Sequence, residues 1–156
     1  MKRSPYNLIQ EIYLEGPISD IKVWKVFICC MLLCRTSREQ VDKIRKNLFD
    51  SWPSPMSMST ANPEELSKMI ISLGFGRKRA EGLIKMSTDY ISKPWKNPSD
   101  LFGLGKYADD AYQIFVRGKR VKNPSDHFLN AYQEWKYKGL IDYEKLERSK
   151  KFMTHQ

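Results

Sequence analysis

The stretch LFGLGKY, residues 101–107, sets two glycines around one apolar residue between two expected helices. Glycine lets the backbone bend sharply and come close to a ligand. The amides that begin the following helix carry a positive partial charge, which suits a phosphate. Gly103, Gly105 and Lys106 are therefore candidate phosphate-binding residues. For the motif in isolation, a plain helix–helix turn in which glycine only ends the first helix is the favoured interpretation.

The pentapeptide KNPSD stands on both sides of this stretch, at Lys96–Asp100 and at Lys122–Asp126. Each copy precedes apolar residues, and Asn, Ser or Asp before an apolar run is typical of a helix start. The second copy places Asp126 21 residues beyond Gly105. A carboxylate at a helix start, downstream of a glycine turn in a basic chain, is more informative than either feature alone.

The chain has 27 lysines and arginines against 18 aspartates and glutamates, a net charge of +9. Such an excess points to an anionic partner, most often nucleic acid and next a membrane surface, although many basic proteins bind nothing acidic. We expect a single domain over residues 1–156, with short flexible ends at about 1–4 and 152–156. The sequence has neither an apolar run of about 18 residues nor the apolar segment of a signal peptide. The expected compartment is therefore the cytosol or nucleus.

The three cysteines, Cys29, Cys30 and Cys34, all lie in the apolar run VFICCMLLC. Their odd number and their position on one expected helix argue against a disulfide framework. A zinc site or an iron–sulfur cluster needs four ligands at recognisable spacing, and the chain has only two histidines. We therefore expect buried thiols that act as small hydrophobes, and no metal or other cofactor.

The apolar spacing is helical almost throughout, and no segment shows the alternation of a strand, so an all-α fold is expected. Residues 54–61, SPMSMSTA, are expected to form a loop because they follow Pro53 and precede the capping Asn62. The expected helices are 23–34, 38–52, 62–74, 74–92, 106–118, 127–139 and 141–152.

Five segments together carry a resemblance to a known family: SPYNLIQE (4–11), CRTS (34–37), LGFGRKRAEGLIKMSTDYI (73–91), KPWKNPSDLFGLGKYADDAYQIF (93–115) and NPSDHFLNAYQEW (123–135). They resemble the helix–hairpin–helix DNA glycosylases, and within these the catalytic domains of the methyl-CpG-binding domain protein 4 family of mismatch thymine and uracil glycosylases. The chain departs from that pattern at Cys34, where Asn is expected, and at Phe128, where Lys is expected. The family's methyl-CpG-binding domain is absent from these residues.

The resemblance implies a helical bundle with a DNA-binding cleft and no iron–sulfur cluster. It implies that Asp126 is the catalytic carboxylate, and it leaves Asp100 as a helix cap. A carboxylate stabilises the positive charge that develops on a deoxyribose as its base departs, and a helix N-terminus favours its ionised form. Bifunctional relatives carry a lysine two residues beyond the second hairpin glycine. Tyr107 stands there, so we expect a monofunctional enzyme.

The remaining expected site residues contact DNA. Gln10 and Tyr107 would hold the extruded base, Arg35 would fill the gap in the stack, and Phe75 would wedge beside the orphaned base. Further DNA contacts are expected from Arg77, Lys78 and His127. Without the resemblance these would be a surface Gln, a half-buried Tyr, a packed Phe and a solvated basic face.

The expected function is therefore removal of thymine or uracil mispaired with guanine, by a monomer in the nucleus that acts on double-stranded DNA. Two alternatives stay open at this point. The same fold could remove another damaged base, or the hairpin could belong to a DNA-binding module without catalysis.

Overall fold

The computed structural model describes residues 3–124 and 126–138, and every regular element in these residues is helical. This confirms the all-α prediction. The main helices are α1 (Asp20–Leu32), α2 (Arg38–Ser51), α3 (Pro55–Ser59), α4 (Pro63–Met69), α5 (Gly76–Ser92), α6 (Lys106–Ala111) and the helix over residues 127–138. Short 3-10 helices cover Ile9–Leu14 (η1), Ile71–Leu73 (η2) and Pro98–Asp100 (η3), and a π-helical turn, η4 (Tyr112–Val116), follows α6.

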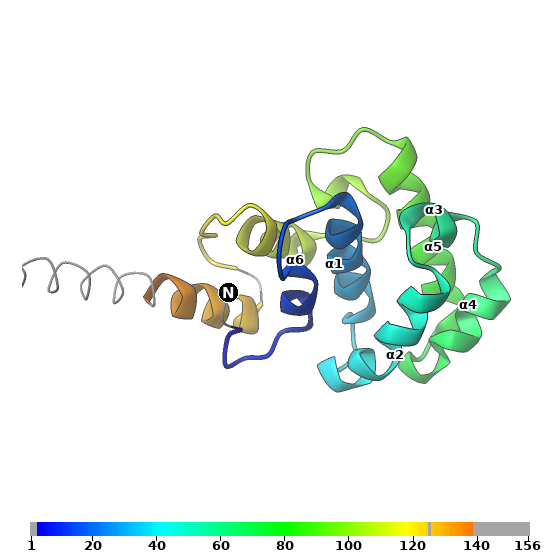
Figure 1. Ribbon diagram of the computed structural model, residues 1–156, viewed down its shortest axis with the longest axis horizontal. Coiled ribbons are helices and arrows are strands. Elements are labelled where there is room, and N and C mark those ends of the chain that lie inside the picture. Colours follow the sequence, from blue (N-terminus) through cyan, green and yellow to red (C-terminus); the bar gives the residue numbers. More distant parts are fainter. Residues whose placement is uncertain (1–2, 125, 139–156) are drawn as a thin grey trace, which may run out of the picture.

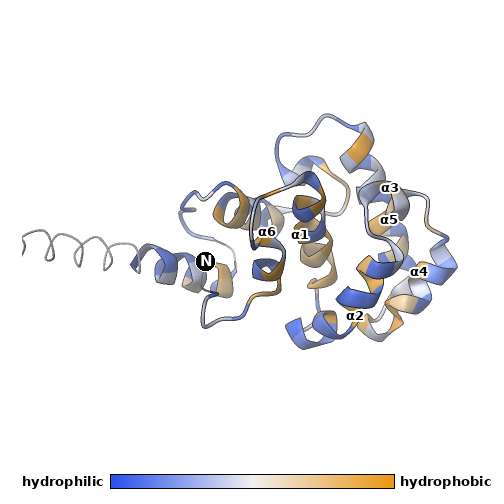
Figure 2. Ribbon diagram, in the orientation of Figure 1, coloured by the Kyte–Doolittle hydropathy of each residue, from blue (hydrophilic) through white to orange (hydrophobic). Residues whose placement is uncertain are grey.

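Helix α1 forms the centre of the fold. It lies between α6 and the helix 127–138 on one side and α2 to α5 on the other (Figure 1). Trp24, Phe27 and Ile28 are fully buried along it. The Trp24 indole donates to the Ser87 hydroxyl at 3.0 Å and so joins α1 to α5. Figure 2 shows α1 as largely hydrophobic, whereas hydrophilic residues dominate the outer faces of α2 and α4.

Three expectations about local structure are wrong. The helix expected over 106–118 is α-helical only as far as Ala111, where the π-helical turn η4 follows. Residues 54–61 are not a loop throughout, because the Ser54 hydroxyl accepts from the Ser57 amide at 3.1 Å and Pro55 opens α3. Cys29 and Cys30 are buried as expected, but Cys34 is exposed because it lies beyond the end of α1. The helix expected over 141–152 lies outside the described residues. None of the described helices is long and apolar enough to cross a membrane.

Candidate active site

An open cleft of about 1350 Å³ lies where the N-terminal segment, the end of α1, the start of α5, the glycine hairpin and the start of the helix 127–138 meet. Nine of the residues predicted to be functional line it: Gln10, Arg35, Phe75, Lys78, Gly103, Gly105, Lys106, Tyr107 and Asp126. Residues more than a hundred positions apart in the chain therefore share one cavity. The two predicted DNA contacts Arg77 and His127 do not line it.

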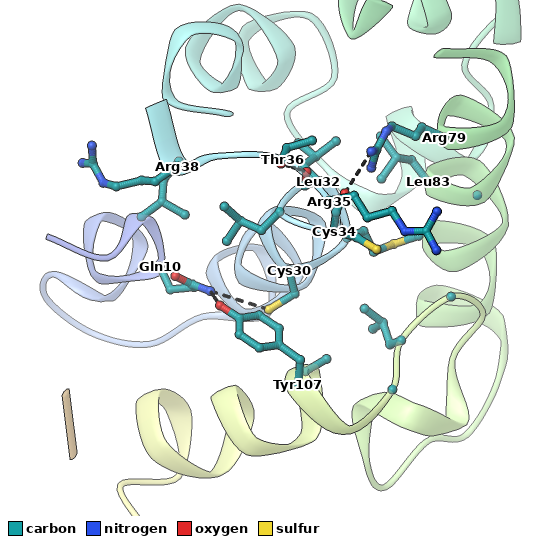
Figure 3. Close-up of a pocket in the computed structure, with 18 of the residues that line it drawn as sticks. Gln10, Cys30, Leu32, Cys34, Arg35, Thr36, Arg38, Arg79, Leu83 and Tyr107 are labelled. Atoms are coloured by element: carbon teal, nitrogen blue, oxygen red, sulfur yellow. Dashed lines mark hydrogen bonds between the residues drawn. The ribbon is translucent and has the colours of Figure 1, made fainter. Parts of the chain in front are cut away.

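Gln10, Cys30 and Tyr107 converge from three different elements at the floor of the cleft (Figure 3). The Gln10 Nε2 donates to the Tyr107 hydroxyl at 2.8 Å and approaches the Cys30 sulfur at 3.9 Å. The Gln10 Oε1 is buried and has no hydrogen-bond partner. A buried acceptor without a partner is costly, so the floor of the cleft is suited to a ligand that brings an N–H donor.

The ionisable groups at this floor are held in their neutral forms. Burial raises the pKa of Tyr107 well above its usual range, and the nearby Cys30 and Asp126 raise it further. Burial also raises the pKa of the Cys30 thiol to about 12. Both groups therefore keep their protons at neutral pH, and the Tyr107 hydroxyl remains a donor as well as an acceptor.

A buried carboxylate holds Gln10 in place. Glu11 accepts from the Ser4 amide at 2.7 Å, the Ser4 hydroxyl at 2.8 Å and the Leu8 amide at 2.9 Å. These bonds fold the N-terminal segment back on itself before η1 begins. Arg3 adds an ion pair with Glu15 at 2.6 Å. The segment expected to be a flexible end thus includes residues 3 and 4 that tie the base of the cleft together.

Asp126 begins the helix 127–138 and also faces the cleft. Its Oδ2 accepts from the Leu129 amide at 2.9 Å, and its backbone carbonyl accepts from the Asn130 amide at 3.1 Å. It is therefore a helix cap, and it is only partly buried. The positive end of a helix stabilises a negative charge at this position.

The two glycines of the hairpin have different surroundings. Gly103 has a left-handed φ of +76°, and a Cβ there would come within 2.8 Å of the Met31 methyl group. Gly105 has no such φ, and a Cβ there would meet no atom within 4 Å. Leu101 and Leu104 are buried on either side. Packing and backbone conformation therefore explain why residue 103 is glycine. They do not explain the glycine at 105, where the space above the backbone is open.

Arg35 and Phe75 share an unusual backbone conformation at the rim of the cleft. Their φ values are +58° and +51°, which residues other than glycine rarely adopt. The Thr36 hydroxyl donates to the Leu32 carbonyl at 2.5 Å, and the Ser37 hydroxyl accepts from the Gln40 amide at 3.1 Å. The sequence after Arg35 thus ends α1 and starts α2, and the arginine is left exposed. Phe75 is 70% exposed.

Three predicted site residues are engaged or oriented in ways that the sequence did not indicate. Lys106 pairs with Asp110 at 2.9 Å on its own helix. Arg77 pairs at 2.9 Å with Glu81, which lines the cleft, but Arg77 itself does not line it. His127 is exposed and contacts the Phe128 ring edge to face, with centroids 5.4 Å apart.

Sequence reasoning missed several cleft residues. Phe102 and Phe128 are 47% and 54% exposed there, and Arg79 and Lys85 add positive charge. The departure of Phe128 from the family pattern was the available signal for that residue. Apolar spacing predicts which residues are buried, and it gives no indication of which aromatic side chains stay exposed at a cavity. Within residues 3–124 and 126–138, no group of three His, Cys, Asp or Glu side chains is placed to hold a metal ion.

Comparisons with known proteins point to one superfamily. Residues 28–152 match the HhH-GPD superfamily of base excision DNA repair proteins. The chain is 38% identical over 137 residues to the methyl-CpG-binding domain protein 4-like protein of Arabidopsis thaliana, which covers 86% of this chain and 29% of that protein. It is 30% identical over 103 residues to the thymine/uracil-DNA glycosylase of Pyrobaculum aerophilum, with 62% of this chain and 45% of that protein covered.

Among solved structures, a thermostable thymine-DNA glycosylase superposes with a TM-score of 0.58 at 21% identity, over 72% of this chain and 61% of that one. At this identity the superposition shows the shared fold. The chain spans less than a third of the Arabidopsis relative and less than half of the Pyrobaculum one.

Proposed function

The chain belongs to the HhH-GPD superfamily of base excision DNA repair proteins, a family of DNA glycosylases, and we propose that it removes thymine or uracil mispaired with guanine. The observation that carries the proposal is the meeting of Asp126 with the Gln10–Tyr107 pair in one cleft. The product would be an abasic site in an uncut strand.

In the proposed reaction the bond between C1′ of the deoxyribose and the base breaks, and its electron pair leaves with the base. The sugar then carries positive charge, which the Asp126 carboxylate stabilises from the edge of the cleft. Water adds to C1′ and loses a proton, to solvent directly or by way of Asp126, and the departed base anion takes up a proton from solvent, so that the net reaction is hydrolysis. A preorganised charge of this kind typically contributes about 100–1000-fold in rate.

The floor of the cleft supports a pyrimidine with an N–H on its pairing edge. Thymine and uracil carry a donor at N3, and the buried Gln10 Oε1 lacks one. Cytosine has an acceptor at N3, so its N3 lone pair would face a lone pair of the Gln10 Oε1, with no hydrogen between them. The same acceptor would therefore favour the deaminated bases over cytosine.

Extrusion of a base leaves a gap, and the cleft rim carries two exposed side chains suited to fill it. The Arg35 guanidinium can stack on bases, and the Phe75 ring can separate a base step. The hairpin at Gly103 and Gly105 would receive a backbone phosphate where open space lies above Gly105. Lys78 would add a phosphate contact from the same cleft.

Monofunctional chemistry is supported by what stands beside the hairpin. Tyr107 occupies the position that holds a nucleophilic lysine in bifunctional relatives, and its phenol is held neutral. The neighbouring Lys106 is ion-paired with Asp110. We also propose that the protein acts as a monomer in the nucleus, because its substrate would be genomic duplex DNA.

The test uses duplexes that carry G·T, G·U, A·T or 8-oxoguanine pairs, incubated with the protein and then cleaved at abasic sites with alkali. The proposal expects cleavage of the G·T and G·U duplexes only after alkali, and none of A·T. Cleavage without alkali would contradict the monofunctional assignment. Release from the 8-oxoguanine duplex alone would favour a glycosylase for another lesion.

A further inference from the structure

Arg79 joins the two turns that carry Arg35 and Phe75. It lies on α5 and lines the cleft. Its Nε donates to the Gly74 carbonyl at 2.8 Å, and its Nη2 donates to the Cys34 carbonyl at 2.9 Å. Figure 3 shows Arg79 bonded to Cys34 beside Arg35. One side chain therefore joins two segments, at Cys34 and at Gly74, that are 74 − 34 = 40 positions apart in the sequence.

The position of the two acceptors explains what this bridge fixes. The Cys34 carbonyl belongs to the peptide unit that enters Arg35, and the Gly74 carbonyl belongs to the peptide unit that enters Phe75. A peptide unit is planar, so holding its carbonyl fixes the direction from which the next residue starts. Both next residues have the left-handed φ that is strained for any side chain. Such conformations persist only when their surroundings hold them.

We infer that Arg79 is a positioning residue that holds Arg35 and Phe75 as a single unit, so that the gap-filling arginine and the wedging phenylalanine enter the duplex together. The inference rests on the proposed function, because it concerns the side chains that replace an extruded base. It assigns Arg79 no contact with the base or the sugar. Its role is to fix the positions of the Arg35 and Phe75 side chains relative to each other.

The chemistry of the side chain suits this role. The guanidinium is a rigid planar fork whose N–H groups point in different directions, so one group can serve two carbonyls. A lysine has one terminal nitrogen on a flexible stem, and it cannot span both acceptors in the same way. The Arg79 amide also donates to the Phe75 carbonyl at 2.8 Å, so the same residue closes the first turn of α5.

The test compares Arg79→Lys with Arg77→Lys, a matched control on the same helix whose arginine pairs with Glu81 and does not itself line the cleft. Both variants keep the charge, so non-specific attraction to DNA is preserved. Single-turnover base release is measured on a G·U duplex and on the same uracil within an unpaired bubble, where no pair has to be replaced. Arg79→Lys is expected to slow release from the duplex about tenfold, the scale of one lost hydrogen bond to a charged donor. Release from the bubble is expected to stay near the wild-type rate, and Arg77→Lys should show no such selectivity.

A second measurement separates positioning from general destabilisation. Arg79→Lys is combined with the double variant Arg35→Ala/Phe75→Ala and assayed on the duplex. If Arg79 acts through these two side chains, the lysine substitution should produce no further loss in that background. An equal loss in both backgrounds, or an equal loss on duplex and bubble, would overturn the inference. If the wild-type protein releases no uracil from either substrate, the proposed function fails instead.

Discussion

The two KNPSD pentapeptides have the same five residues and use their aspartates in opposite directions. Asp100 turns back, and its Oδ2 accepts from the Lys96 and Asn97 amides at 2.9 and 3.0 Å. Asp126 turns forward to the Leu129 amide at 2.9 Å. The first aspartate is exposed outside the cleft, and the second lines it.

The backbones of the two copies differ as well. Asn97 is extended at φ −121°, whereas Asn123 is left-handed at φ +54°, although a proline follows both and restricts both backbones. The first copy forms only the single turn η3, and the second leads into the helix 127–138. Identical local sequence therefore takes two conformations, so residues outside the pentapeptide decide which one forms.

Replacement of the second aspartate should have the largest effect. Asp126→Asn removes the charge but keeps an oxygen that can accept from the Leu129 amide, and Asn is as good a cap as Asp. Base release from a G·U duplex should fall about 100–1000-fold with little change in melting temperature. The matched variant Asp100→Asn should release base at the wild-type rate. Equal losses in the two variants would show that the carboxylates are not distinguished as described.

The hairpin between the two copies offers the next test. Gly103→Ala forces a side chain into a left-handed conformation and should lower the free energy of unfolding by about 1–2 kcal/mol. Gly105→Ala meets no protein atom, so its stability should change by less than about 0.5 kcal/mol. Its affinity for duplex DNA should fall roughly tenfold, since an approaching phosphate would lose a close amide contact.

Urea unfolding and fluorescence anisotropy with labelled DNA measure the two quantities separately. A Gly105→Ala protein that binds DNA normally would leave the phosphate site without support.

Asp100 should contribute to the pH dependence of the free energy of unfolding. The amides of Asn97 and Lys96 hold the pKa of Asp100 below its ordinary value of 3.8. A depressed folded-state pKa stabilises the protein at pH values above the unfolded-state pKa, and this contribution is lost as the pH falls through the folded-state pKa. Asp100→Asn should therefore be less stable than wild type at neutral pH, and the difference should shrink below about pH 4. Urea unfolding across that range measures it, and a difference that grows toward low pH would contradict the assignment.

The smallest effect is expected at the two asparagines. Asn97→Gly should cost about 0.5–1 kcal/mol, because glycine adds freedom to the unfolded chain and gains nothing at an extended position. Asn123→Gly has the same entropic cost but relieves a left-handed residue, so its stability should stay within about 0.5 kcal/mol of wild type. Equal losses at both positions, measured by thermal unfolding, would contradict the difference in backbone conformation.

Much of the fold follows from local pattern. The apolar residues around α1 predict a central helix, and Asn62 followed by Pro63 predicts the start of α4, where the Asn62 Oδ1 accepts from the Glu64 amide at 2.9 Å. The α3 helix was missed because Ser54 and Pro55 are equally common in loops. The helix expected over 106–118 was too long as a single α-helix, since a π-helical turn replaces its second half.

The candidate site could be predicted less completely from the local sequence pattern. Motif resemblance indicated the residues that line the cleft, but the contacts that position them join distant segments. No periodic pattern in the sequence predicts the hydrogen bond of Gln10 to Tyr107 or that of Arg79 to the Cys34 carbonyl. A basic run such as Arg77–Arg79 predicts charge, and it does not distinguish the arginine that lines the cleft, Arg79, from the arginine that does not, Arg77.

The hydrogen bond between Gln10 and Tyr107 closes a loop of 97 residues. The cleft is therefore assembled from segments that span most of the described chain, from Tyr6 to Phe128. Under the proposed function, a chain translated only as far as the hairpin holds the glutamine and lacks the acid, and so would release no base. Base release would thus require synthesis past residue 126, and a fragment cut between the hairpin and Asp126 would be inactive even if it still bound DNA.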